Sequence, residues 1–140
     1  MSSLSKAIKL ARKVHLDQFR RDGKTPYFIH PKRVAKLVKL MGGSEEQIIL
    51  AYLHDVIENF NGDKNFLLSE IKTIFGEKIS KLLLLLTREK NQSYGVYLRK
   101  IRRNKTVLLV KLCDMIDNLS DDPTEKQKIK YLSVFIELVE

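Results

Sequence analysis

Two histidines and two aspartates in this sequence have the residue types of a metal site. His54 and Asp55 are adjacent in the most hydrophobic part of the chain. His30 directly follows Tyr-Phe-Ile, and Asp114 lies in another hydrophobic stretch. Burying an unpaired carboxylate costs several kcal/mol, so each of these groups needs an ion pair or a metal ion. Two imidazoles and two carboxylates suit Mn, Fe, Zn or Mg and leave coordination positions for water, which predicts a catalytic metal site.

Each of these residues by itself has a simpler explanation. A single His-Asp pair in a helix is more often an ion pair with a hydrogen-bonded histidine. His30 alone would more often be a hydrogen-bonded loop histidine, and Asp114 alone a buried aspartate that caps a helix or forms an ion pair. The metal site is favoured because four such groups occur together in apolar surroundings.

A further acidic residue, Glu58, follows the His54-Asp55 pair by about one helical turn. At about 100° per residue, Asp55 lies about 100° and Glu58 about 40° from His54 around a helix axis. We therefore expect these three side chains to converge on one sector of a central helix, with Glu58 projecting between the other two.

Hydrophobic residues at three- and four-residue spacing predict that every long segment of the chain is helical. We expect an all-α, single-domain helical bundle over residues 1–140, because no repeat or break in composition marks a second domain. The expected helices cover residues 4–21, 31–41, 44–59, 68–75, 77–87, 94–103, 107–119 and 123–139.

Turn and capping residues set several of these boundaries. Ser44, followed three residues later by Gln47, has the pattern of a capping box. Asp122 is the expected cap of the last helix, with a proline in the first turn and Glu125 completing the box. Residues 27–30 stand between two prolines, and we expect a short irregular link there.

The bulk composition is that of an ordinary globular protein. The chain has 140 residues, 44% of them hydrophobic and 31% charged, which suits one folded core. The longest apolar run, residues 82–86, is far too short for a membrane span, and the N-terminus has no apolar signal sequence. The one cysteine, Cys113, excludes a disulfide framework and is expected to be a small buried hydrophobic residue. We therefore expect a cytoplasmic protein.

The chain is strongly basic, with 26 Lys and Arg against 17 Asp and Glu and a formal net charge of +9. Such a charge attracts anionic partners over long range. A nucleic acid, a polyphosphate nucleotide and an acidic protein all fit, and so does a cationic surface that is merely solvated. Composition alone leaves the class of partner open.

Four segments, taken in order, carry a resemblance to a known family. They read HLDQFRRDGKTPYFIHP at 15–31, AYLHDVIEN at 51–59, IFGEKISKLLLLLT at 74–87 and VKLCDMIDNL at 110–119. With these segments the sequence resembles the HD superfamily of metal-dependent phosphohydrolases. Within it, the sequence is similar to the hydrolase domain of the RelA/SpoT homologues and to the small alarmone hydrolases, which remove the 3′-pyrophosphate of guanosine tetra- and pentaphosphate. The resemblance runs nearly end to end and implies an HD-type helical bundle.

The resemblance also implies roles for individual residues. The family typically holds one divalent metal, most often Mn²⁺, which lowers the pKa of a bound water. Glu58 matches the first of two family carboxylates that orient and deprotonate this water. Position 59 departs from the family, because Asn59 can form hydrogen bonds but cannot act as a base. The implied metal ligands are His30, His54, Asp55 and Asp114.

For the substrate, the resemblance assigns Arg20 and Arg21 to phosphate and Asn118 to the nucleoside or its sugar. Guanidinium groups match phosphate geometry, although solvent-facing arginines explain the same sequence. The expected activity is hydrolysis of a nucleotide, first of guanosine 3′,5′-bis(diphosphate). Alternatives are another HD-type nucleotidase or phosphodiesterase, or a catalytically weakened module that binds a metal or nucleic acid. A nucleic acid partner is not favoured, no membrane is expected, and a homo-oligomer is left open.

Overall fold

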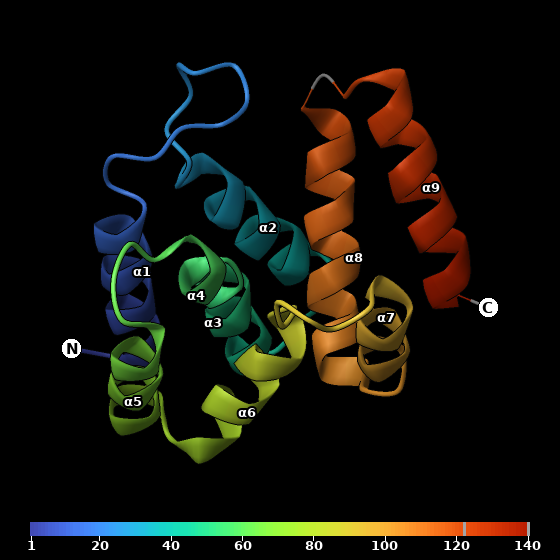
Figure 1. Ribbon diagram of the computed structural model, residues 1–140. Coiled ribbons are helices and arrows are strands. Elements are labelled where there is room, and N and C mark those ends of the chain that lie inside the picture. The colour runs from blue at the N-terminus through green and yellow to red at the C-terminus, as the bar shows by residue number, and fades with distance from the viewer. Residues whose placement is uncertain (122, 140) are drawn as a thin grey trace.

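Helices make up nearly all regular structure in the part of the chain that the computed structural model describes, residues 1–121 and 123–139 (Figure 1). The exception within those residues is an isolated antiparallel bridge between Phe19 and Pro26. The expectation of an all-α fold is confirmed. The helices are α1 (Ser3–Val14), α2 (Ile29–Leu40), α3 (Glu45–Leu53), α4 (Val56–Asn59), α5 (Lys64–Phe75), α6 (Glu77–Leu86), α7 (Tyr94–Arg102), α8 (Lys105–Ser120) and α9 (Glu125–Val139).

Helix α3 lies at the centre of the bundle because it is apolar around most of its circumference. It packs against α1, α2, α6 and α8, and α2 in turn packs against α8 (Figure 1). Leu50, Ala51 and Leu53 of α3 are fully buried, as is Val34 of α2. The end of α3, the start of α2 and the middle of α8 are thereby held together, and these places carry the predicted metal ligands.

The capping signals of α3 work as predicted. The Ser44 hydroxyl accepts a hydrogen bond from the Gln47 backbone N–H at 3.2 Å, and the Gln47 side chain accepts one from the Ser44 N–H at 2.9 Å. Cys113 is buried, with 1% of its surface exposed, and has a free thiol. Among the described residues, no helix has the length and hydrophobicity that a membrane span requires.

The prediction that the first helix reaches Arg21 is wrong, because α1 ends at Val14. The chain after it forms a loop that returns on itself, with the Arg20 N–H donating to the Thr25 carbonyl at 2.8 Å. The Asp22 carboxylate holds the tip by accepting hydrogen bonds from the N–H groups of Lys24 and Thr25. This local capping satisfies backbone donors that a helix would otherwise use.

The expected continuous helix over residues 44–59 is also interrupted. The chain turns at His54 and Asp55, and Asp55 has φ −104° and ψ 1°, between the helical and extended regions. Active-site residues often have this conformation. The projection angles expected for a straight helix therefore do not apply to Glu58.

Two further boundaries differ from the prediction. Helix α2 begins at Ile29, so His30 lies in its first turn and not in an irregular link. Helix α9 begins at Glu125 and not beside Pro123, because Thr124 and Gln127 form reciprocal hydrogen bonds at its start. The expected cap Asp122 lies outside the described residues. The remaining helices cover their predicted segments with small shifts, the largest being the earlier start of α5.

Truncation of the α3 core should destabilise the fold. Leu50 is fully buried, so Leu50→Ala should lower the free energy of unfolding by about 2–5 kcal/mol. Leu40, which is 73% exposed at the end of α2, provides the matched control Leu40→Ala. Urea denaturation followed by circular dichroism measures both changes. Equal effects of the two substitutions would contradict a core centred on α3.

Candidate active site

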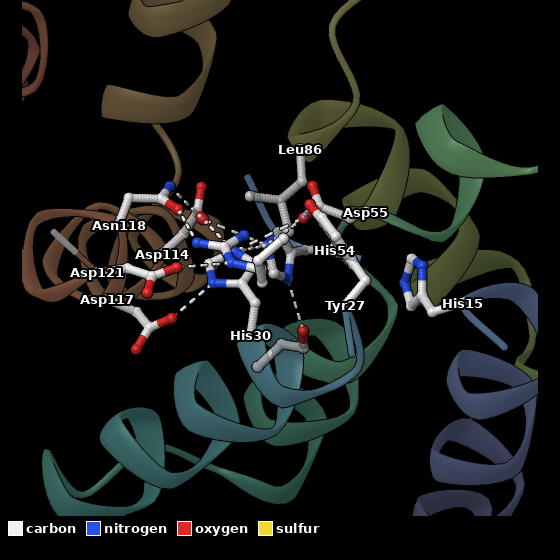
Figure 2. A network of polar contacts seen from close by, with 12 residues as sticks. His15, Tyr27, His30, His54, Asp55, Leu86, Asp114, Asp117, Asn118 and Asp121 are labelled. Carbon is white, nitrogen blue, oxygen red and sulfur yellow. Dashed lines mark hydrogen bonds and ion pairs between the residues drawn. The ribbon is translucent and has the colours of Figure 1, made fainter. Parts of the chain in front are cut away.

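The four predicted metal ligands meet in one place, although they come from three separate parts of the fold (Figure 2). His30 lies in the first turn of α2, His54 and Asp55 in the turn between α3 and α4, and Asp114 on α8. The Nε2 atoms of the two histidines are 3.2 Å apart. Asp114 Oδ1 lies 2.8 Å from the His30 Nε2 and 3.3 Å from the His54 Nε2. Asp55 Oδ2 lies 3.1 Å from the His54 Nε2 and 3.6 Å from the His30 Nε2.

Hydrogen bonds on the far side of each imidazole fix which nitrogen faces the cluster. His54 Nδ1 donates to the carbonyl of Ala51 at 2.6 Å, and a carbonyl can only accept. His30 Nδ1 donates to the Asp117 carboxylate at 2.7 Å. In the neutral form of each ring, Nε2 therefore carries a lone pair.

Two imidazole lone pairs and two carboxylate oxygens point into one small volume, and all four are electron donors. The imidazoles and Asp114 are almost fully buried, and Asp55 is largely so. Such a set fits a divalent cation with mixed nitrogen and oxygen ligands. The ligand atoms of His30, His54 and Asp55 all lie within 4.8 Å of one another, as binding to one ion requires.

The electrostatics of the cluster show its demand for positive charge. Burial would lower the pKa of His54, but the charges of Asp55 and Asp114 outweigh burial and raise the pKa well above its ordinary value. Burial would likewise raise the pKa of Asp114, but the neighbouring Lys111 and His54 hold it well below the usual range. Both shifts favour the ionised carboxylate beside a cation. A metal ion must therefore compete with protons for these imidazoles.

Asp114 is held by two residues of its own helix. Lys111 Nζ lies 3.1 Å from Asp114 Oδ2, and Asn118 Nδ2 donates to Asp114 Oδ1 at 3.1 Å. The Lys111 side chain is only 13% exposed and its ammonium group lies 5.5 Å from the centre of the Tyr97 ring. This lysine therefore does not extend into solvent. By occupying Oδ2, Lys111 leaves Oδ1 facing the two imidazoles.

A group of residues that the sequence analysis assigned no role supports the site from the α1 side. The Tyr27 hydroxyl donates to Asp55 Oδ2 at 2.6 Å, and the His15 ring packs against Tyr27 with centroids 4.8 Å apart (Figure 2). His15 Nδ1 bonds to Gln18 Oε1 at 2.8 Å, and Gln18 Nε2 donates to the Asn59 carbonyl at 2.7 Å. One loop thus holds a proposed metal ligand and the end of α4.

Asp117 was also missed, although its position carries a signal. It follows Asp114 by three residues and so lies on the same face of α8. Its carboxylate is buried and bonds to His30 across 87 residues of sequence. Tyr27, His15 and Gln18 all fall within the segment 15–31 that carries the family resemblance, which is the signal that could have identified them.

Glu58 lies beside a small cavity next to the cluster. The cavity has a volume of about 30 Å³ and is bordered by His54, Asp55, Glu58, Lys111 and Asp114 together with apolar side chains. A cavity of this size has room for a water molecule, which needs about 10–15 Å³. The protein atoms around the Glu58 carboxyl group and the charge of Asp55 raise its pKa, although the residue is also exposed to solvent, and a raised pKa suits a group that accepts a proton. Glu58 Oε1 accepts a hydrogen bond from the Arg88 N–H at 3.0 Å, which leaves Oε2 for other partners.

Asn59 ends α4 and is half-buried. Its side chain lies close enough to the Tyr27 hydroxyl to lower the pKa of that phenol, although burial and the charge of Asp55 leave the phenol pKa raised overall. The amide thus contributes to the surroundings of Asp55 through Tyr27. It supplies no second carboxylate beside Glu58.

The three predicted substrate residues line a second, larger cavity. This cavity has a volume of about 280 Å³, and its walls include Arg20, Arg21 and Asn118 together with His30, Asp55 and Asp114. Arg20 Nε lies 2.9 Å from Asp121 Oδ2, and its Nη2 donates to Asn118 Oδ1 at 2.9 Å. The Arg20 side chain is only 9% exposed, so the reading of Arg20 as a solvent-facing residue is wrong.

Arg21 is more exposed and reaches the last helix. It donates to the Gln127 side chain and, at 2.9 Å, to the Asp121 carbonyl. Gln127 and Tyr131 of α9 also line the larger cavity. The structure therefore places both arginines where an anion beside the cluster would meet them.

Loss of the Asp117 carboxylate should weaken metal binding. Asp117→Asn removes the negative charge that accepts the hydrogen bond from His30 Nδ1–H. Loss of such a partner of a metal ligand typically lowers metal affinity by about 10–100-fold, and we expect a decrease of that size here. Titration calorimetry with Mn²⁺ measures it. Asp17→Asn makes the same change at an exposed position and should leave affinity unchanged. Equal dissociation constants for both variants would show that Asp117 does not support the site.

Comparison with known proteins gives the same family along almost the whole chain. The HD domain family profile matches residues 7–135. A guanosine-3′,5′-bis(diphosphate) 3′-pyrophosphohydrolase of Aquifex aeolicus is 33% identical over 124 residues, which cover 83% of this chain and 17% of that protein. A GTP pyrophosphokinase of Brucella melitensis is 36% identical over 127 residues, covering 83% of this chain and 16% of that protein. The chain thus spans about a sixth of the length of these curated relatives.

A solved structure has the same fold. It is that of a metazoan orthologue of SpoT that hydrolyses ppGpp, with a TM-score of 0.80 and 22% sequence identity over 99% of this chain and 84% of that one. The family is one that binds divalent metals, in agreement with the histidine and aspartate cluster. From the profile match and the fold we conclude that this chain belongs to the HD domain family.

Proposed function

We propose that this protein is a metal-dependent phosphohydrolase that acts on a nucleotide. The first candidate reaction is removal of the 3′-pyrophosphate from guanosine 3′,5′-bis(diphosphate), the substrate for which the Aquifex relative is named. The observation that carries the proposal is the convergence of two imidazole Nε2 atoms and two aspartate oxygens beside a cavity walled by two arginines. We propose His30, His54, Asp55 and Asp114 as the ligands of one divalent cation, with Mn²⁺ as the first choice.

The residues around the proposed metal have two proposed roles, to accept a proton and to orient the metal ligands. A divalent cation at this position supplies Lewis-acid chemistry, because it lowers the pKa of water and offsets negative charge at phosphorus. Glu58 borders the water-sized cavity, and its raised pKa suits proton acceptance at Oε2. Lys111 and Asn118 hold the orientation of Asp114, and Tyr27 holds that of Asp55.

The larger cavity is the proposed position of the substrate phosphates. Arg20 and Arg21 place guanidinium donors on its wall, and these match the geometry of phosphate oxygens. Asn118 contacts Arg20 and Asp114, so it connects the proposed phosphate position with the metal ligands. A phosphate bound in this cavity would lie beside the proposed metal ligands. Asp55 and Asp114 also border the small cavity next to Glu58, so Glu58 lies on the other side of these two ligands.

One observation favours a second candidate, a nucleotidase or phosphodiesterase of the same family. Asn59 stands where the alarmone hydrolases resembled by this sequence have a second carboxylate. An amide cannot take up a proton, so the chemistry that needs two acids is weakened. The buried free thiol of Cys113 suits a reducing compartment, and we propose a cytoplasmic location for either activity.

A substrate panel separates these candidates. Purified protein should contain close to one transition metal per chain, and with Mn²⁺ added it should hydrolyse guanosine tetraphosphate faster than nucleoside monophosphates or an aryl phosphate. Faster turnover of a monophosphate would favour the nucleotidase. Absence of hydrolysis of every compound, with metal bound, would refute the proposed activity.

Loss of the Glu58 carboxylate should abolish most turnover. Glu58→Gln keeps the shape of the side chain but removes the base, and a decrease in kcat of about 100-fold or more is expected. Metal content should be unchanged, because Glu58 is not a proposed ligand. Glu77→Gln, at an acid that is 63% exposed on α6, is the matched control. Unchanged turnover in Glu58→Gln would show that its assigned role is wrong.

Restoring the second carboxylate should raise alarmone hydrolysis. Asn59→Asp supplies a group that can accept a proton, and an increase in kcat of about tenfold or more is expected for guanosine tetraphosphate. Release of pyrophosphate in steady-state assays measures the change, with an aryl phosphate as a reference substrate. An unchanged rate would place the limitation elsewhere in the pocket.

A further inference from the structure

The net positive charge of this protein comes from one part of the chain. Residues 1–43 contain eleven Lys and Arg and two Asp, whereas residues 44–140 contain fifteen of each sign. The entire formal charge of +9 therefore belongs to the first 43 residues. Three of these cations lie in the loop beside the candidate active site. The other eight are exposed on α1 and α2, where the proposed reaction does not use them.

Four of these cations form the rim of a groove between α1, α2 and α3. The groove has a volume of about 560 Å³. Its rim consists of Lys32, Arg33, Lys36 and Lys39, all exposed. None of the four forms an ion pair with another described residue. Cations without partners beside an open groove are available to an anionic ligand.

The floor of the groove is apolar. It is formed mainly by half-buried aliphatic side chains, including Ile29 and Ile48, with Tyr52 at one side. The centres of the Tyr52 and Phe28 rings are 6.1 Å apart in a stacked arrangement, and Arg12 covers Phe28 at 5.0 Å. One face of the Tyr52 ring is therefore covered, and Tyr52 is the one aromatic side chain among the residues that line the groove, so the groove offers little area on which nucleotide bases could stack. An apolar floor with a charged rim is instead the anatomy of a protein interface.

From this anatomy we infer that the groove binds an acidic, amphipathic helix of a partner protein. The apolar face of such a helix would cover Ile29, Ile48 and Tyr52, and its Asp and Glu side chains would meet the rim. Lys32, Lys36 and Lys39 recur at intervals of four and three residues along α2, about 6 and 4.5 Å apart in rise. Carboxylates spaced in the same way on a helix alongside α2 would match them.

The groove is separate from the candidate active site. None of its lining residues is a proposed metal ligand or borders either of the two cavities at the cluster. Helix α2 carries both, with Ile29 facing the groove and the neighbouring His30 facing the metal cluster. The binding proposal therefore stands whether or not the proposed hydrolase activity is found.

Fluorescence anisotropy with defined probes tests the inference. The first probe is a labelled helical peptide of about 18 residues, or five turns, with Leu on one face and Glu on both flanks. A second peptide has Lys in place of every Glu, and the other probes are oligouridylate and phosphatidylglycerol vesicles. The acidic peptide should bind the full chain with micromolar affinity that falls as salt is raised. Saturating guanosine tetraphosphate with Mn²⁺ should not displace it.

Matched charge reversals locate the binding surface. Lys36→Glu with Lys39→Glu should weaken binding of the acidic peptide by about tenfold or more, because each reversal replaces attraction by repulsion. Arg99→Glu with Arg102→Glu reverses two exposed cations at the same spacing on α7 and should change binding less than about twofold. Circular dichroism verifies that both double variants remain folded.

Several outcomes would overturn the inference. These are failure of the acidic peptide to bind, equal binding of the Lys peptide, and equal weakening by the α7 reversals. Displacement by the nucleotide would place the peptide in the active site instead. Tighter binding of oligouridylate or of vesicles, lost in the α2 variant, would identify the groove as a site for nucleic acid or for a membrane surface.

Discussion

The structure depends on one electrostatic constraint: buried carboxylates and imidazole lone pairs face each other across about 3 Å in the bundle core. Donor groups arranged in this way repel one another unless positive charge lies among them. In the protein alone, protons can meet this demand, which is why the pKa of His54 is raised well above its ordinary value. A divalent cation meets the same demand with one ion. Binding that ion would stabilise the folded state, because the unfolded chain has no such cluster.

Much of the surrounding polar network keeps these donors in place. The Ala51 carbonyl and Asp117 fix the two rings, and Lys111 and Tyr27 fix one oxygen of each aspartate. The two imidazoles and Asp114 are bonded on their far sides, which leaves both Nε2 atoms and Asp114 Oδ1 directed at the cluster. Tyr27 instead bonds Asp55 Oδ2, the oxygen that faces the imidazoles. The arrangement follows the general rule that the partners of metal ligands determine ligand orientation and proton position.

The residues around the cluster are of two kinds: those that match the family pattern and Asn59, which departs from it. The four proposed ligands would account for metal binding, and the neighbouring arginines would account for attraction of a phosphate. Asn59 departs from the carboxylate pair of the alarmone hydrolases and changes only the proton-transfer side of the site. The chain therefore combines a complete ligand set with an incomplete pair of acids. Substrate preference is the property on which this departure acts most directly.

The basic residues of the chain also fall into two kinds, which differ in burial and in whether other side chains hold them in place. The Arg20 side chain is only 9% exposed and is fixed by Asp121 and Asn118, which suits its proposed role of orienting a phosphate. Lys32, Lys36 and Lys39 are exposed and unfixed, which suits attraction of a partner more than precise orientation. Composition could not distinguish these two kinds, because it contains no information on burial.

The amino-acid sequence by itself determined the all-α class, most helix positions and the four proposed ligands, since apolar periodicity and the surroundings of His54 and Asp114 are local features. Only the tertiary structure decided the end of α1, the break at His54 and Asp55, and the burial of Lys111. It also supplied Tyr27 and Asp117, whose bonds to Asp55 and His30 span 28 and 87 residues of sequence. Such contacts are absent from any local pattern, because they form only when distant helices pack. The local pattern predicts a continuous helix over residues 44–59, but the chain turns at His54 and Asp55, and both of these side chains lie in the cluster.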